Sequence, residues 1–244
     1  LVRIACHCNE VTAVIPVCKW LKSVGYRVGL NIMQIADRTK KEIELVASEI
    51  EATDVEVLYF ADSLGSLNPE QTLSNINSLR SFWSGSLGIH THDNMGRAID
   101  NTLQAVKGGV TWVDSTVTGM GRGSGNAQTE YLVIELEHML ERKVKLTPLL
   151  ALIKDYITPL KVLHGWGRNP YYYLAGKYGV HPTFVQQMLG DPRYTESDIL
   201  SVIEHLRKVG GKKYSATNLE QGRQRFGIAT IGTWSPINLL HERE

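Results

Sequence analysis

The stretch GIHTHDNMGRAIDNTLQAVKGGVTWVDSTVTGMGRGSGNAQTE, residues 88–130, decides how this chain is read. It opens with His-x-His at the end of a strand-like run, and alternate strand residues point to one face of a sheet. His90 and His92 therefore project together, roughly 7 Å apart at Cα. Histidine is the commonest metal ligand, so both rings can reach one divalent cation. A strand-end histidine can instead hydrogen-bond a neighbouring loop. We expect a metal site that contains both.

Short apolar, β-rich stretches recur about every 27 residues, with helical periodicity between them. This alternation predicts parallel strands joined by right-handed crossovers. A doubly wound sheet has the same pattern, but the regular spacing favours the α/β class with a TIM (β/α)₈ barrel, which has roughly 30 residues per unit. Five units cannot close a barrel, so we expect the N-terminal strands to be missing from this chain. The five predicted strands are Val2 to Cys6, Arg27 to Ile32, Val55 to Phe60, Leu87 to Thr91 and Val110 to Thr116.

The rhythm changes after Leu146. Thr147-Pro148 opens a helix to about Leu163, which we interpret as an outer helix of the barrel. Residues 1–164 are therefore predicted to be a partial barrel, residues 165–226 a small all-α accessory domain, and residues 227–244 a linker or tail. The predicted helices are 40–52, 69–82, 97–107, 128–140 and 147–163 in the first part, and 171–178, 181–189, 195–209 and 215–226 in the second.

Composition limits the possible partners. The chain has 244 residues, 43% of them hydrophobic and 21% charged, as expected of a soluble globular protein. A net charge of +1 gives no indication of nucleic-acid or membrane-surface binding. No apolar run approaches the roughly 20 residues needed to cross a bilayer. Three cysteines are a low, odd count that favours a reducing cytoplasm.

Polar residues follow the predicted strands at the edge where barrels place their sites. Asp62 and Ser63 end the third strand and Thr116 ends the fifth, and we expect all three to contact substrate. An Asx-type turn that caps the loop explains Asp62 equally well.

The glycine-rich turn from Gly119 to Asn126 allows close backbone approach to a ligand. Its spacing matches neither a P-loop nor the dinucleotide fingerprint. Asn126 offers an amide oxygen to a hard cation, although the segment could also be a flexible turn.

The chain resembles the barrel metal-dependent lyases and synthases, a family that includes 3-hydroxy-3-methylglutaryl-CoA (HMG-CoA) lyase, 2-isopropylmalate synthase and 4-hydroxy-2-oxovalerate aldolase. Three features carry the resemblance: His90-x-His92, the Gly119 to Asn126 turn and Asp62-Ser-x-Gly65. The chain is most similar to the hydroxy-oxo-acid aldolases. The lyase branch has a cysteine-containing loop, and this chain has no cysteine after Cys18; the synthases have a Gly-Glu-Arg that is absent here.

The resemblance implies a cytoplasmic enzyme that holds Mn²⁺ or Mg²⁺ through His90, His92 and Asn126. Family members add an aspartate from an Arg-Asp pair, which this sequence lacks. The implied reaction cleaves or forms a carbon–carbon bond in a 4-hydroxy-2-oxo acid, giving a 2-oxo acid such as pyruvate and an aldehyde. A helical-region tyrosine assists in the aldolases, which makes Tyr171 and Tyr172 the candidates for catalysis.

Other readings stay open at this point. The same scaffold supports acyl-CoA-dependent Claisen condensation and an HMG-CoA lyase-like reaction, and a catalytically inactive barrel scaffold is the non-enzymatic alternative. The resemblance also implies a homo-oligomer and an aldehyde dehydrogenase partner.

Overall fold

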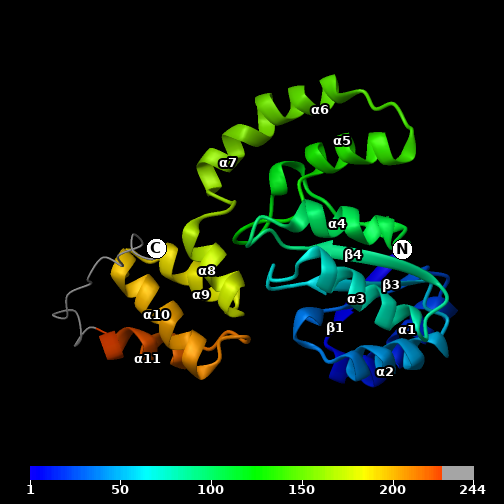
Figure 1. The fold of residues 1–244 in the computed structure, drawn as a ribbon, viewed down its shortest axis with the longest axis horizontal. Coiled ribbons are helices and arrows are strands. Elements are labelled where there is room, and N and C mark those ends of the chain that lie inside the picture. Colours follow the sequence, from blue (N-terminus) through cyan, green and yellow to red (C-terminus); the bar gives the residue numbers. More distant parts are fainter. Residues whose placement is uncertain (227–244) are drawn as a thin grey trace, which may run out of the picture.

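A computed structural model describes residues 1–226. Its centre is a five-stranded parallel sheet in which the strands follow one another in the order of the sequence, β1-β2-β3-β4-β5 (Figure 1). The strands are β1 (Val2–Cys6), β2 (Val28–Ile32), β3 (Val57–Asp62), β4 (Ser86–Thr91) and β5 (Trp112–Val113). A doubly wound sheet reverses its strand order at a switch point, and this sheet does not. The order is that of consecutive barrel strands.

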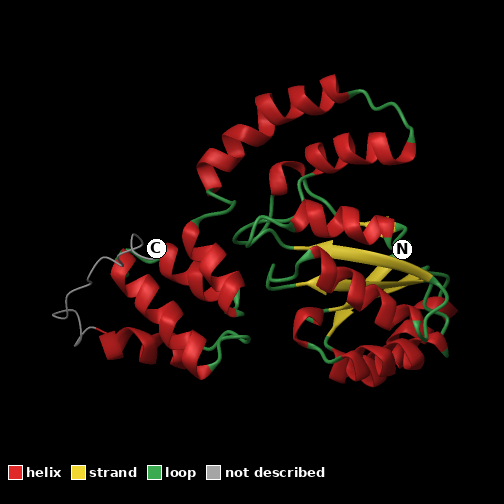
Figure 2. Cartoon of the chain, viewed as in Figure 1, coloured by secondary structure: helices red, strands yellow, loops and turns green. Residues whose placement is uncertain are grey.

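Helices cover one face of the sheet, and each helix contacts the next along the chain (Figure 2). The strand residues on that face are apolar and buried, with Leu30, Leu58 and Leu87 side by side in the register. Burial of this face against the helices forms the first hydrophobic core. The helices of this layer are α1 (Val11–Ser23), α2 (Lys40–Glu51), α3 (Pro69–Arg80), α4 (Ala98–Lys107) and α5 (Thr129–Leu140).

The other face of the sheet is polar and concave. Arg3 lies on β1, at one edge, yet its guanidinium Nη1 lies 2.6 Å from Oδ2 of Asp114, which follows β5 at the opposite edge. Four strand spacings in a flat sheet amount to about 19 Å, more than these two side chains can span. The sheet must therefore curve, as the wall of a barrel does.

Tyr59 occupies the middle of this concave face. The Arg3 guanidinium stacks on its ring at 4.4 Å, and a Cβ at Gly88 would collide with the same ring. Glycine at position 88 on β4 therefore lets the tyrosine lie flat across the sheet.

Local signals explain where the helices begin. Thr39 and Asn68 close capping boxes with Glu42 and Gln71. Helix α1 is not among the predicted helices. Val11 and Cys18, which are seven residues apart and both buried, show the helical spacing that indicates it.

Two predicted elements differ from the structure. The fifth strand is two residues long instead of seven, because the backbone after Val113 turns to bond with the glycine-rich segment, Thr116 N–H donating to Ala127 O at 3.0 Å. The predicted helix 147–163 is α6 (Leu146–Leu152) and α7 (Thr158–His164), joined by a π-helical turn. Pro159 lacks the N–H that a regular helix needs at that point.

The last four described helices have a hydrophobic cluster of their own, centred on buried Phe184, Val202 and Leu206. They are α8 (Pro170–Tyr178), α9 (Pro182–Leu189), α10 (Glu196–Val209) and α11 (Ala216–Phe226). Figure 1 places this group beside the end of the sheet at which the strands finish. Residues 227–244, predicted as a linker or tail, lie outside the described residues.

No helix among residues 1–226 is long and apolar enough to cross a membrane.

Candidate metal centre

A cavity of about 810 Å³ opens at the carboxyl ends of the strands. His90, His92 and Ser63 line it from the sheet, and His181 and Tyr214 line it from the helical group. The structure thus brings the His-x-His pair to the sheet edge where parallel α/β proteins bind ligands.

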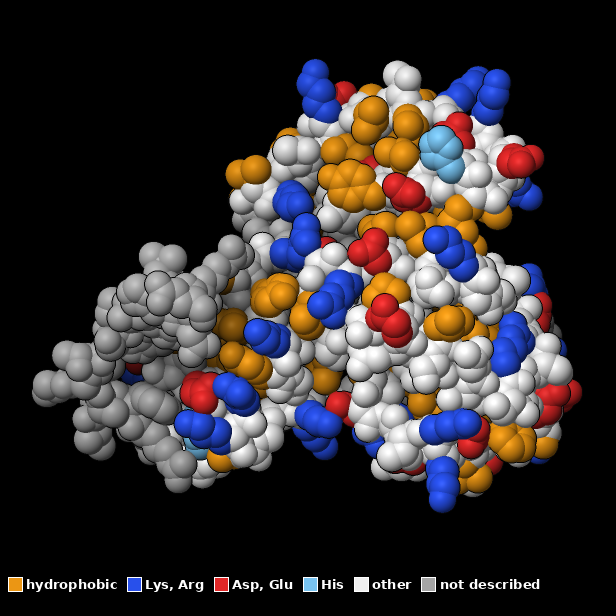
Figure 3. Space-filling view, viewed as in Figure 1, with side chains coloured by type: hydrophobic (Ala, Val, Ile, Leu, Met, Phe, Trp, Pro, Cys, Tyr) orange, Lys and Arg blue, Asp and Glu red, His pale blue; other side chains and the backbone are white. Residues whose placement is uncertain are grey.

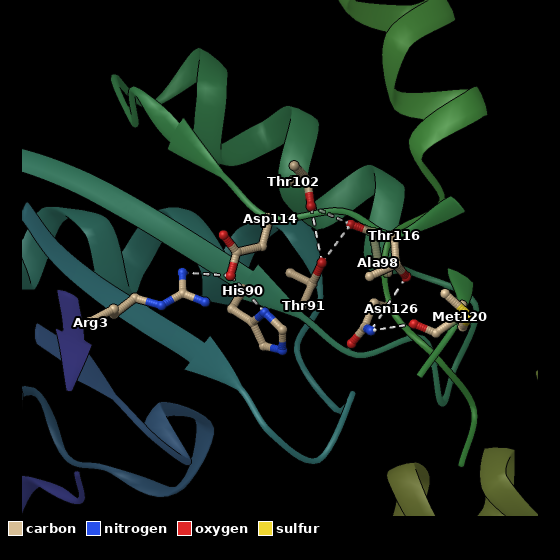
Figure 4. Close-up of polar contacts among 9 residues, drawn as sticks. All are labelled: Arg3, His90, Thr91, Ala98, Thr102, Asp114, Thr116, Met120 and Asn126. Atoms are coloured by element: carbon tan, nitrogen blue, oxygen red, sulfur yellow. Dashed lines mark hydrogen bonds and ion pairs between the residues drawn. The ribbon is translucent and has the colours of Figure 1, made fainter. Parts of the chain in front are cut away.

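Asp114 fixes the orientation of the His90 ring (Figure 4). His90 Nδ1 lies 2.9 Å from Asp114 Oδ2, the same oxygen that Arg3 contacts. Burial opposes ionisation of Asp114, but the hydrogen bond from His90 and the charge of Arg3 hold its pKa below the usual value. An ionised carboxylate only accepts, so Nδ1 of His90 donates in this hydrogen bond, and Nε2 is the ring nitrogen not engaged by Asp114. Carboxylate partners orient metal-binding histidines in this way.

His92 is held in its neutral form. Burial, followed by the electrostatic effects of His90, Arg122 and His181, lowers its pKa from 6.5 to about 3. The two histidine rings lie edge to face, with centroids 5.0 Å apart. Two imidazoles this close can offer a pair of nitrogen donors to one ion.

Asn126 lies next to His92 through an antiparallel backbone bridge. Its Nδ2 donates to Met120 O at 3.2 Å, while its Oδ1 is buried without a partner in the described part of the chain. In Figure 4 this oxygen is on the side of His90. A Cβ at Gly121 would come within 2.5 Å of Asn126 Nδ2, so glycine is needed there.

These donors fit a divalent ion. They comprise two imidazole nitrogens and an amide oxygen that lacks a hydrogen bond, a combination that suits first-row metals such as Mn²⁺. Residues 1–226 contain no cluster of three His, Cys, Asp or Glu side chains that could hold a metal. The described residues thus form a partial ligand set.

The three residues expected to contact substrate differ in position. Ser63 lines the cavity, and its Oγ accepts the N–H of Gln34 at 3.0 Å. Asp62 points to the helix side, where it is fully buried and accepts the N–H groups of Ser66 and Leu67 at 3.0 and 3.1 Å. This geometry agrees with the capping alternative, not with substrate contact. Thr116 lies behind the site, with its Oγ1 3.4 Å from Asn126 Nδ2.

The candidate tyrosines lie outside the cavity lining. Tyr172 is buried against the glycine-rich turn, where a Cβ at Gly123 would be 3.2 Å from its ring, and Tyr171 packs against the helical core. Neither therefore faces the cavity, because α8 turns them toward packing contacts. The tyrosine that lines the cavity is Tyr214, in the loop before α11.

Sequence reasoning missed several residues of the site, among them Asp114, His181 and Tyr214. Asp114 follows the last strand at the same edge as His90, and that position was an available signal. Tyr214 had no local signal, because the loop that carries it reaches the cavity only through tertiary packing.

Polar contacts attach the helical group to both sides of the cavity. Lys212 Nζ pairs with Asp37 at 2.6 Å, and Arg122 donates to Thr183 Oγ1 at 2.8 Å. The helical group therefore forms one wall of the cavity.

A third attachment runs through the fully buried Asn94. Its Nδ2 donates to the carbonyl of Tyr172 on α8 at 3.3 Å, and its Oδ1 accepts from Ser124 of the glycine-rich turn at 2.6 Å. The loop after β4, the turn and α8 are thus linked at one side chain.

Comparison with known proteins agrees with this geometry. The chain is 30% identical over 219 residues to 4-hydroxy-2-oxovalerate aldolase of Carboxydothermus hydrogenoformans, covering 87% of this chain and 64% of that protein. Among other aldolases of that name it spans about half of their length.

Two solved structures share the fold. The N-terminal domain of a putative aldolase from Bacteroides vulgatus matches with a TM-score of 0.72 at 28% identity, over 81% of this chain and 65% of that one. HMG-CoA lyase of Bacillus subtilis matches with a TM-score of 0.56 at 22% identity, over 65% of this chain and 56% of that one. The parallel sheet therefore corresponds to part of a TIM-barrel domain.

The family model described as HMGL-like matches residues 3–155, which include every strand of the sheet, both histidines and the glycine-rich turn. On that match, the chain belongs to the HMGL-like family.

Proposed function

We propose that this protein is a divalent-metal-dependent carbon–carbon lyase that acts on a 4-hydroxy-2-oxo acid. The observation that carries the proposal is the pair of imidazoles that His90 and His92 present to the cavity, with Asn126 bridged to His92 through the backbone and its Oδ1 without a partner in the described residues. The names of the relatives, which are 4-hydroxy-2-oxovalerate aldolases, support the choice of substrate class.

His90, His92 and Asn126 would hold the ion, with Mn²⁺ or Mg²⁺ as the candidates. When bound, it would act as a Lewis acid that stabilises negative charge on the oxygens of the 2-oxo acid. Asp114 and Arg3 keep the His90 ring oriented, and Gly121 leaves room for the amide of Asn126.

The reaction is a retro-aldol cleavage. The 4-hydroxyl loses its proton to a base, the C3–C4 electron pair moves into the three-carbon fragment, and an aldehyde leaves. The fragment then takes a proton at C3 and becomes pyruvate or a homologue.

Cavity-lining side chains can serve this proton movement. Tyr214 offers a hydroxyl that can carry a proton, and we assign to it the role first expected of Tyr171 or Tyr172. His181 accepts the N–H of Thr183 on Nδ1, which leaves Nε2–H as a donor toward the cavity. The Ser63 hydroxyl accepts from Gln34 and retains its own proton to donate to substrate oxygen.

We further propose residues 165–226 as an accessory domain that covers the site. Its separate hydrophobic cluster and its contribution of His181 and Tyr214 to the cavity support this assignment. Self-association and pairing with an aldehyde dehydrogenase stay predictions.

Substrate tests separate the aldolase from a Claisen enzyme. The full-length protein is incubated with Mn²⁺, pyruvate and propanal, and in parallel with a 2-oxo acid and acetyl-CoA. We expect a 4-hydroxy-2-oxo acid in the first reaction, lost on chelation of the metal, and no free thiol in the second. Thiol release only with acetyl-CoA would replace the proposal with Claisen condensation, and product from neither reaction would favour an inactive scaffold.

A further inference from the structure

Cationic side chains are concentrated around the cavity. Arg38, Arg122 and Lys213 line it, against the single carboxylate of Glu10. The whole chain has a net charge of only +1. The excess of positive charge is therefore a local property of this cavity and not a consequence of composition.

Two of these cations have no carboxylate partner. Within residues 1–226 neither Arg122 nor Lys213 forms an ion pair; Arg122 donates only to the neutral hydroxyl of Thr183. Both side chains are exposed, so solvent screens their repulsion, and both are free to pair with an anionic group that enters the cavity.

Arg38 adds a third incompletely paired group. Its Nη1 lies 3.4 Å from Glu42, whose carboxylate is already engaged with Thr39, and its Nε is buried without a partner in the described residues. A buried N–H donor without an acceptor is costly, and a ligand oxygen in the cavity could supply that acceptor.

The segments that carry Arg122 and Lys213 both contact the start of α9. Arg122, on the glycine-rich turn, bonds to Thr183 in the first turn of the helix. The loop that carries Lys213 is held to the same point, where the N–H of His181 donates to Gly211 O at 2.7 Å.

The cavity is also large. Its volume of about 810 Å³ is near the upper end of the range for small-molecule sites.

We propose that the substrate carries a second anionic group, a phosphate or carboxylate on the part released as the aldehyde, and that Arg122 and Lys213 bind it. This inference rests on the proposed function for the bond that is broken, and it names the class of aldehyde. Arginine suits bidentate recognition of phosphate or carboxylate, and lysine adds a point charge.

Matched aldehyde pairs test the substrate class. Aldol addition to pyruvate with Mn²⁺ is measured for D-glyceraldehyde 3-phosphate against D-glyceraldehyde, and for succinic semialdehyde against butanal. We expect at least one anionic member to exceed its neutral match tenfold or more in kcat/KM. The better pair identifies phosphate or carboxylate as the recognised group. Equal values in both pairs would overturn the proposal.

Charge-removing variants test the residues. Arg122→Gln and Lys213→Gln should each lower kcat/KM for the preferred anionic aldehyde about tenfold, and that for its neutral match by a smaller factor. The exposed Arg142→Gln and Lys177→Gln variants are controls and should change neither. An equal loss with anionic and neutral aldehydes would mean that the residues do not read the anion.

A binding measurement separates this inference from the proposed function. Calorimetric titration of the metal-free, chelator-treated protein with inorganic phosphate, glyceraldehyde 3-phosphate and succinic semialdehyde should show binding of at least one of them that weakens at least fivefold in the Arg122→Gln variant. Binding of this kind without aldolase activity would support the anion site and contradict the proposed lyase function. Aldolase activity on neutral aldehydes without such binding would support the lyase function and contradict the anion site.

Discussion

The two faces of the sheet differ sharply. The helix-covered face carries Leu30, Phe60 and Ile89, buried in the core, whereas the concave face carries Arg3, Tyr59 and other polar groups that contact one another across the sheet. The period of two in a strand lets one segment serve both faces. Adjacent residues therefore have separate tasks: odd positions of β3 and even positions of β4 face the cavity side, and their neighbours pack in the core.

The largest effect should come from the concave side. His92→Ala removes one of the two imidazoles, and we expect kcat/KM to fall by about a thousandfold or more, with the melting temperature of the metal-free protein little changed. Manganese titration and steady-state kinetics measure the effect. His138→Ala, on an exposed site of α5, is the control. Full activity in His92→Ala would remove the metal centre from consideration.

A substitution on the apolar face should produce the opposite pattern. Phe60 is fully buried, and Phe60→Ala should lower the free energy of unfolding by about 3–5 kcal/mol because it leaves a cavity. Urea denaturation measures the loss. Phe82→Ala, at a side chain 49% exposed, should cost about 0.5 kcal/mol or less. Comparable losses in the two variants would contradict the assignment of this face to the core.

Asp62 is a carboxylic acid on the otherwise apolar face, so the two faces can also be compared through the pH dependence of stability. Burial raises its pKa from 3.8 to about 6, against the lowering effect of backbone N–H groups. The folded state then holds the proton more tightly than the unfolded chain between about pH 4 and 6. Unfolding free energy should therefore fall as pH rises through that window, by about 2–3 kcal/mol relative to Asp62→Asn. Urea titrations from pH 4 to 7 measure it. If the unmodified protein instead gained stability relative to Asp62→Asn as pH rose, the N–H groups would outweigh burial.

The smallest effect concerns the residue behind the histidines. Asp114→Asn keeps an acceptor for His90 but loses the charge that orients it, so manganese affinity should fall about 10- to 100-fold. The exposed Asp100→Asn variant on α4 is the control. Unchanged affinity in Asp114→Asn would mean that its ion pair with Arg3 serves only the fold.

Sequence periodicity was sufficient for the parallel sheet and for most helices, because strands and helices bury their apolar residues at distinct spacings. Strand geometry alone was sufficient to predict that His90 and His92 point to the same face. Asp62 was ambiguous, since a carboxylate after a strand suits a loop cap as well as a ligand contact. The positions of Tyr171 and Tyr214 could not be predicted in this way. Which side of α8 packs inward, and which loop reaches the cavity, depend on how the helical group docks, and neither propensity nor spacing encodes that docking.

The side chain of Asn94 forms two hydrogen bonds, one to α8 and one to Ser124, and so couples the position of α8 to that of the glycine-rich turn. If α8 swings away from the sheet, it pulls on the same amide that anchors the turn bearing Asn126. A displacement of α8 would therefore strain the turn that holds Asn126 beside His92.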